Sequence, residues 1–108
     1  MNSTKLDFFS GKSVTIEEIL TERNNSHGPF SNQASCSQDL KEIFHIYFKD
    51  NPRVAQLDFK EEKIILEAID MILHKIARIA VGNPYVKDHW DDIAGYSALP
   101  AKFCEKIK

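Results

Sequence analysis

The sequence lacks several features that would each point to a particular class of protein. It has no apolar run near the roughly 18 residues that a transmembrane helix needs, so we expect no membrane span. Its 14 Lys and Arg are outnumbered by 16 Asp and Glu, and this balance argues against a nucleic-acid-coating protein. Its two cysteines, Cys36 and Cys104, have no CxxC spacing, which predicts reduced thiols rather than a disulfide.

The length of 108 residues predicts one domain with a modest core. Residues 1–13 show no hydrophobic periodicity and no signal-peptide pattern, so we expect a flexible N-terminal arm. Residues 14–108 are then a single all-helical domain.

Hydrophobic periodicity predicts an all-α, four-helix bundle-like fold, because no window alternates with period 2. The expected helices cover about 15–23, 37–49 and 58–81, followed by a fourth from Asp88 that Pro100 interrupts before 101–107. Ser13 or Thr15 can cap the first helix, and Asp58 with Glu61 reads as a capping box for the third.

One side of the third helix is polar. Glu67, Asp70, His74 and Arg78 are spaced i, i+3, i+7 and i+11, with Lys75 at the margin, and the isoleucines occupy the opposite side. Such a stripe is also typical of an ordinary solvated helix face.

A second set of acids follows after a short Gly/Pro loop, so the two helices should be antiparallel. Mg²⁺ takes oxygen ligands and keeps several waters, so a few carboxylates suffice to hold it. The sequence therefore predicts a metal site formed by Glu67, Asp70, Asp88, Asp91 and Asp92.

Several other polar side chains can serve a phosphate ligand. The expected ligand-binding residues are Arg23, His27, His74, Lys75 and Arg78. Two alternatives stay open. Lys75 and Arg78 can instead pair with the acids of the fourth helix. The run from His27 to Phe30 can instead be a helix stop in which Gly28 is left-handed and Phe30 fills the core.

Trp90 and Tyr96 also allow two interpretations. They can stack on a nucleobase, or they can pack between helices with their polar atoms satisfied.

The acid arrangement resembles that of the MazG-type, all-α nucleoside-triphosphate pyrophosphohydrolases. Members of that family bind Mg²⁺ with acidic sets on two helices and split a nucleoside triphosphate into monophosphate and pyrophosphate. The resemblance implies that Glu67 and Asp70 form the first set and Asp88 with Asp91 or Asp92 the second. The double glutamate that opens the family's first motif is Leu66-Glu67 here, and Asp88 stands where its second motif has Glu.

A second resemblance rests on residues 75–79 (KIARI), 88–96 (DHWDDIAGY) and 22–30 (ERNNSHGPF). These segments are similar to those of small phage and prophage proteins of unassigned function. This resemblance implies a location in the cytoplasm of a bacterial host cell.

These observations lead to two main hypotheses. The first is a Mg²⁺-dependent nucleotide-binding protein, a nucleoside-triphosphate pyrophosphohydrolase with Glu67, Asp70 and Asp92 as catalytic residues. The second is a non-enzymatic phage accessory protein that binds a host protein or sequesters a nucleotide. A third hypothesis, a DNA-binding regulator, lacks a helix-turn-helix pattern.

The chain also has more apolar surface than a four-helix domain of this size can bury. We therefore expect a homodimer or a dimer of dimers. Its interface should contain aromatic residues of the second helix and apolar residues of the third.

Overall fold

The computed structural model describes residues 14–104, so the expected N-terminal arm (1–13) and the last four residues lie outside the described part. Four α-helices follow one another: α1 (Ile16–His27), α2 (Phe30–Lys49), α3 (Phe59–Val81) and α4 (Lys87–Cys104), with a 3₁₀ turn at Val54–Gln56. About 84% of the described residues are helical and none forms a strand. The expected all-α, four-helix fold is confirmed.

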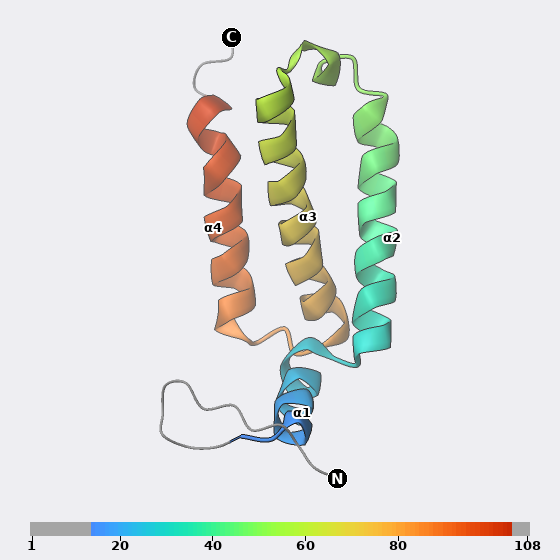
Figure 1. The fold of residues 1–108 in the computed structure, drawn as a ribbon, viewed down its shortest axis with the longest axis vertical. Helices are drawn as coiled ribbons and strands as arrows, with labels where there is room; N and C mark the ends of the chain where they lie inside the picture. The colour runs from blue at the N-terminus through green and yellow to red at the C-terminus, as the bar shows by residue number, and fades with distance from the viewer. Residues whose placement is uncertain (1–13, 105–108) are drawn as a thin grey trace.

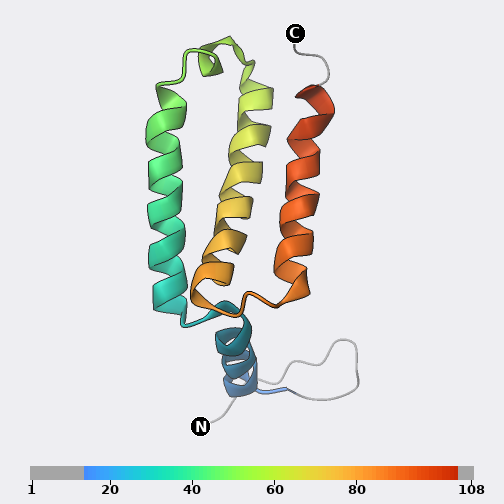
Figure 2. The same cartoon turned by 180° about the vertical axis from the view of Figure 1, so that it is seen from behind.

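The three long helices lie side by side in one layer, with α3 in the middle (Figure 1). The view from behind shows the same order, and α1 lies at the end of the layer, below the start of α2 and the end of α3 (Figure 2). Helix α3 packs against α2 on one side and α4 on the other. Along most of α3, two opposite faces therefore have no neighbouring helix within the described residues.

Local sequence explains where α1 begins and ends. Thr15 is its N-cap: the hydroxyl accepts a hydrogen bond from the Glu18 N–H, and the Glu18 carboxylate accepts one from the Thr15 N–H. The expected end near residue 23 is wrong, because the helix continues to His27. It ends at Gly28, whose φ of 80° favours glycine.

Helix α2 begins at Phe30, seven residues before the expected start. The polar first two turns hid the helix from the hydrophobic pattern. The interpretation of Phe30 as a core residue is also wrong, because it is 77% exposed.

Helix α3 matches the prediction in its bounds and in Asp58 as its N-cap. The Asp58 carboxylate accepts a hydrogen bond from the Glu61 N–H at 2.7 Å, which is one of the two bonds of the predicted capping box. Helix α4 instead passes through Pro100 without interruption. A proline removes one backbone hydrogen bond, and a helix near its end tolerates this loss better than one at its centre. Among residues 14–104, no helix is long and apolar enough to cross a membrane.

Two glycines allow the α1–α2 corner to lie against the end of α3. A Cβ added to Gly28 would collide with the carbonyl of Val81, and one added to Gly82 would collide with the backbone of His27. The Asn83 N–H also donates to the Ser26 carbonyl across this joint at 3.1 Å. The end of α1 is therefore held against the end of α3.

The interior of the single chain is thin. Within the described range, the buried hydrophobic residues are Ala68 and Ala77, and the buried polar residues are Gln33, Ser37 and His89. Small side chains at Ala68 and Ala77 allow close helix packing, but they bury little apolar area. Most of the large apolar side chains stay half-buried or exposed.

Candidate functional site

The polar stripe of α3 lies on one of the two open faces of the layer, here called the polar face. At one margin the carboxylate of Asp70 accepts a hydrogen bond from His45 of α2 at 3.0 Å. At the other margin the Lys75 ammonium contacts Asp92 of α4 at 2.9 Å. The stripe between these two contacts has α2 and α4 as its walls.

Four basic side chains gather where this face meets α1, and we call them the cationic cluster: Arg23, His27, Lys75 and Arg78. Burial and, after it, the positive charges of its neighbours, Arg78 first, together lower the pKa of His27 to about 4. Burial also lowers the pKa of the Arg78 guanidinium, as does the charge of Arg23. The cluster therefore disfavours additional positive charge, as an anion site does before its ligand binds.

One carboxylate partly offsets this charge. The hydrogen bond from Lys75 holds the pKa of Asp92 below its ordinary value. The negative charge of Asp92 in turn raises the pKa of Arg78, which opposes the effect of burial. The alternative prediction that Lys75 pairs with an acid of the fourth helix is confirmed. The Lys75 side chain is only 12% exposed, so this pair is partly shielded from water.

The most unusual atom of the cluster is Nε of Arg78. It is buried and has no hydrogen-bond partner within the described structure. A buried donor without a partner costs free energy, roughly 1–3 kcal/mol, and charged groups cost more. An anion that accepts a hydrogen bond here would recover that cost.

A small polar network positions His27. Its Nδ1 lies 2.5 Å from the Ser26 hydroxyl oxygen, within hydrogen-bond distance. Its ring meets the ring of His89 edge to face, with the centroids 5.1 Å apart. His89 donates from Nε2 to the Ser26 carbonyl at 3.0 Å and is 2% exposed. Sequence reasoning missed His89 and Ser26, because nothing local indicates that these distant segments meet.

His74, expected as a ligand-binding residue, is held by α2 instead. Its Nε2 lies 3.1 Å from the Gln33 amide nitrogen and its Nδ1 lies 3.3 Å from the Ser37 hydroxyl. An amide nitrogen can only donate, so Nε2 accepts and the ring proton is on Nδ1. Burial lowers the pKa of His74, and the Arg78 charge adds to this. Gln33 and Ser37, spaced i, i+4 on the inner side of α2, were a pattern that could have indicated this contact.

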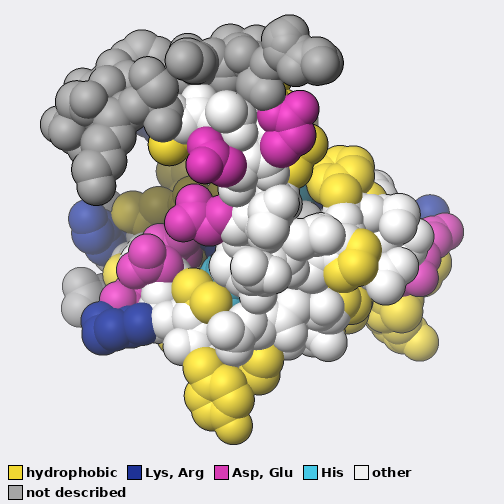
Figure 3. Space-filling model, turned by 90° about the horizontal axis from the view of Figure 1, so that it is seen from below, with side chains coloured by type: hydrophobic (Ala, Val, Ile, Leu, Met, Phe, Trp, Pro, Cys, Tyr) yellow, Lys and Arg dark blue, Asp and Glu magenta, His cyan; other side chains and the backbone are white. Residues whose placement is uncertain are grey.

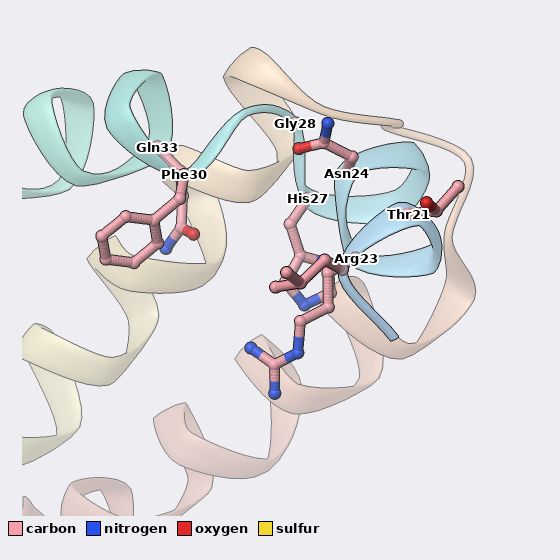
Figure 4. A pocket seen from close by; sticks show the side chains of 8 residues that line it. Thr21, Arg23, Asn24, His27, Gly28, Phe30 and Gln33 are labelled. Carbon is pink, nitrogen blue, oxygen red and sulfur yellow. The ribbon is translucent and has the colours of Figure 1, made fainter. Parts of the chain in front are cut away.

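A cavity of about 390 Å³ opens beside the cluster, and Figure 4 shows its lining. The Arg23 and His27 side chains extend from α1 in the same direction. The exposed ring of Phe30 and the side chain of Leu20, 59% exposed, supply apolar surface. The lining residues are Leu20, Thr21, Arg23, Asn24, His27, Gly28, Phe30 and Gln33.

The expected metal ligands do not converge in one chain. Asp70 is hydrogen-bonded to His45, and Asp92 forms an ion pair with Lys75. Asp91 forms an ion pair with Lys87 of the same helix at 2.6 Å. Glu67 lines a separate hollow with Tyr96 and Leu99, and Asp88 is exposed at the start of α4. In the part of the chain that the structure covers, no three His, Cys, Asp or Glu side chains could hold a metal ion together.

Trp90 and Tyr96 of α4, the two residues expected either to stack on a base or to pack between helices, differ. Trp90 is 53% exposed, and its indole N–H donates to the Pro84 carbonyl at 2.8 Å, so its polar atom is satisfied although the ring is not in the core. Tyr96 is half-buried between α4 and α3.

Figure 3, which looks onto the α1 end, shows hydrophobic side chains projecting at the lower edge and acidic ones toward the upper left.

Comparisons with known proteins place the chain in a family. No curated protein and no solved structure matches it. Residues 14–104, which include α1 to α4 and every expected site residue, match one family over their whole length. The chain therefore belongs to the family described as "Domain of unknown function (DUF6378)".

Proposed function

We propose that this protein binds a magnesium–nucleoside triphosphate on the polar face and hydrolyses it to the monophosphate and pyrophosphate. The observation that carries the proposal is the cationic cluster, with the buried, unpartnered Nε of Arg78 at its centre. The resemblance to MazG-type pyrophosphohydrolases supports the choice of reaction.

The charges of the cluster suit a polyphosphate. Arg23, Lys75 and Arg78 carry three positive charges, of which Asp92 offsets one. His27 is neutral near pH 7 because its pKa is about 4. A bound phosphate would favour its protonated form, so His27 can add a fourth charge once the ligand is in place.

The cavity beside the cluster suits the nucleoside part of the same ligand. Phe30 offers an exposed ring on which a base can stack, and Asn24 offers an amide for hydrogen bonds. Phosphates on Arg23 and Arg78 would leave the base within reach of this lining, because Arg23 belongs to both sets.

The magnesium ion enters this proposal with the substrate. Mg²⁺ bound to a triphosphate keeps several waters and needs only one or two protein carboxylates, so a preformed site of three acids is unnecessary. Asp70 lies on the polar face about 7.5 Å along the helix axis from Lys75, at 1.5 Å per residue. Glu67 follows one turn further.

In this reaction the oxygen of a water molecule would attack the α-phosphorus. The bond between the α-phosphorus and the α–β bridging oxygen would break, and pyrophosphate would leave with that oxygen. Arg78, Lys75 and Arg23 would stabilise the charge that develops on the phosphate oxygens. Asp70 and Glu67 would hold the substrate's metal ion and its bound waters on the side of the phosphates away from α1. Asp92 would hold the Lys75 ammonium in position.

The test is a panel of nucleoside triphosphates with Mg²⁺, assayed for pyrophosphate release and for thermal stabilisation. We expect turnover with at least one of them, and loss of turnover in Glu67→Gln and Asp92→Ala with helical content unchanged. Asp39→Asn, at an exposed position of α2, is the matched control and should keep full activity.

The outcomes separate the alternatives. Pyrophosphate release that survives both site variants would refute the assignment of catalytic residues. Thermal stabilisation without turnover would refute hydrolysis and support nucleotide sequestration. The absence of both would refute nucleotide binding altogether and favour an accessory protein that binds a host protein.

A further inference from the structure

The face of the layer opposite the polar face is apolar and has no neighbouring helix among residues 14–104. At about 100° per residue, Ile65, Ile69, Ile72 and Ile76 lie on the side of α3 opposite the stripe from Glu67 to Arg78. Between residues 63 and 82 this side of α3 carries no charged residue. We call it, with the adjoining surfaces of α2 and α4, the apolar face.

Helix α2 continues this face. His45 contacts Asp70 on the polar face, so the side of α2 opposite His45 belongs to the apolar face. That side carries Ile43 and Tyr47, which are 57% and 75% exposed, and Ile46, which is 48% exposed, adjoins them at the outer edge of the helix. Three large side chains this exposed on one side of a helix are unusual for a surface that faces only water.

Helix α4 completes it. Asp92 contacts Lys75 at the margin of the polar face, and Trp90 lies about 160° away around the helix. Trp90 is 53% exposed. The apolar face therefore spans all three helices of the layer.

We propose that a second copy of this chain covers the apolar face, so that two three-helix layers pack face to face. The most exposed residues on this face are Ile43, Ile46, Tyr47, Ile76 and Trp90. A whole aromatic side chain has a surface of about 150–250 Å², and an isoleucine somewhat less. Multiplied by their exposed fractions, these five side chains expose on the order of 500 Å². A stable interface needs about 800 Å² from each partner. The half-buried isoleucines of α3 add to this area, which brings two copies to the lower end of the range of specific interfaces.

A second copy suits this face better than a different partner. The α3 part of the face carries no charge, and the large exposed side chains on α2 and α4 are apolar, so the face can pack against a copy of itself in an isologous two-fold contact. The contact would give α3 a hydrophobic core that the single chain lacks, since only Ala68 and Ala77 are buried hydrophobic residues in the described range. The polar face stays open, so the inference is independent of the proposed function.

The test compares two tyrosines that are both exposed in the single chain. Tyr47 lies on the apolar face, and Tyr85 lies in the α3–α4 connection and is 90% exposed. We expect the wild-type protein to have a mass of about 25 kDa by light scattering at micromolar concentration, twice the 12.4 kDa of one chain. Tyr47→Lys should weaken self-association at least tenfold, whereas Tyr85→Lys should leave it unchanged.

Circular dichroism across a concentration series keeps the test decisive if the separated chains unfold. Helicity that is lost on dilution in Tyr47→Lys but kept in Tyr85→Lys supports the proposal, because a lysine at position 47 removes little from a single chain. A wild-type mass near 12 kDa would overturn the proposal. A dimer that Tyr47→Lys leaves intact would also overturn it, because the contact would then lie on another surface.

Discussion

Replacing Arg78 with methionine should stabilise the ligand-free protein while weakening its ability to bind polyphosphate. Methionine keeps the length and the apolar character of the side chain but removes the guanidinium. The buried, unpartnered Nε disappears, and so does the repulsion between Arg78 and Arg23.

The magnitude follows from opposing contributions. Removing a buried donor without a partner should recover about 1–3 kcal/mol. Losing the attraction between Arg78 and Asp92, whose side chain is 46% exposed, should offset only part of this gain. The net gain of about 1 kcal/mol corresponds to a rise in melting temperature of about 4 °C for a domain of this size.

Binding should change in the opposite direction. A charge-assisted hydrogen bond contributes about 1.5–3 kcal/mol, so the affinity for inorganic tripolyphosphate should fall by roughly one to two orders of magnitude. Calorimetry would measure this loss, and thermal melts at one fixed protein concentration would measure the stability. Arg53→Met, in the exposed connection between α2 and α3, is the matched control and should change neither quantity. A ligand-free Arg78→Met protein that melts several degrees below wild type would refute the reasoning.

Two further predictions concern pH and backbone conformation. The pKa of His27 is about 4 in the folded protein and 6.5 as its ordinary value, so the unfolded chain binds more protons between these values. The free energy of unfolding should therefore be fully maintained above pH 6.5 and fall as the pH drops toward 4, and urea titrations should show a smaller fall in His27→Gln. Gly28→Ala should destabilise the protein by well over 1 kcal/mol, because φ is 80° and the new Cβ would meet the Val81 carbonyl. Gly95→Ala, with open space around it inside α4, should instead stabilise by about 0.5–1 kcal/mol in the same melts. Equal effects at the two glycines would contradict this account.

Much of the fold could be predicted from the sequence because it depends on neighbours within a helix. The isoleucines of α3 and the Asp58 cap determine that helix almost completely, and they also place Glu67, Asp70, His74 and Arg78 on one side of it. The pairing of Lys75 with an acid of α4 was among the predicted alternatives, because a short loop makes the two helices antiparallel neighbours.

The start of α2 could not be predicted in this way. Its first two turns carry polar residues where a buried stripe would show apolar ones, and two of these, Gln33 and Ser37, are buried against His74. Hydrophobic periodicity cannot detect a helix whose inward side is polar. Because of this contact, His74, which was expected to bind a ligand, instead connects α3 to α2.

The sequence by itself determined which residues share a side of each helix, since that follows from 3.6 residues per turn. Only the tertiary structure decided which neighbour each side meets. It turned Asp70 toward α2 and Asp92 toward Lys75, and it brought Arg23 and His27 of α1 against Arg78, more than 50 positions along the chain. The physical reason is that helix periodicity fixes directions around one axis, whereas the packing of the axes depends on close contacts such as that of Gly28 with Val81, which no local pattern encodes.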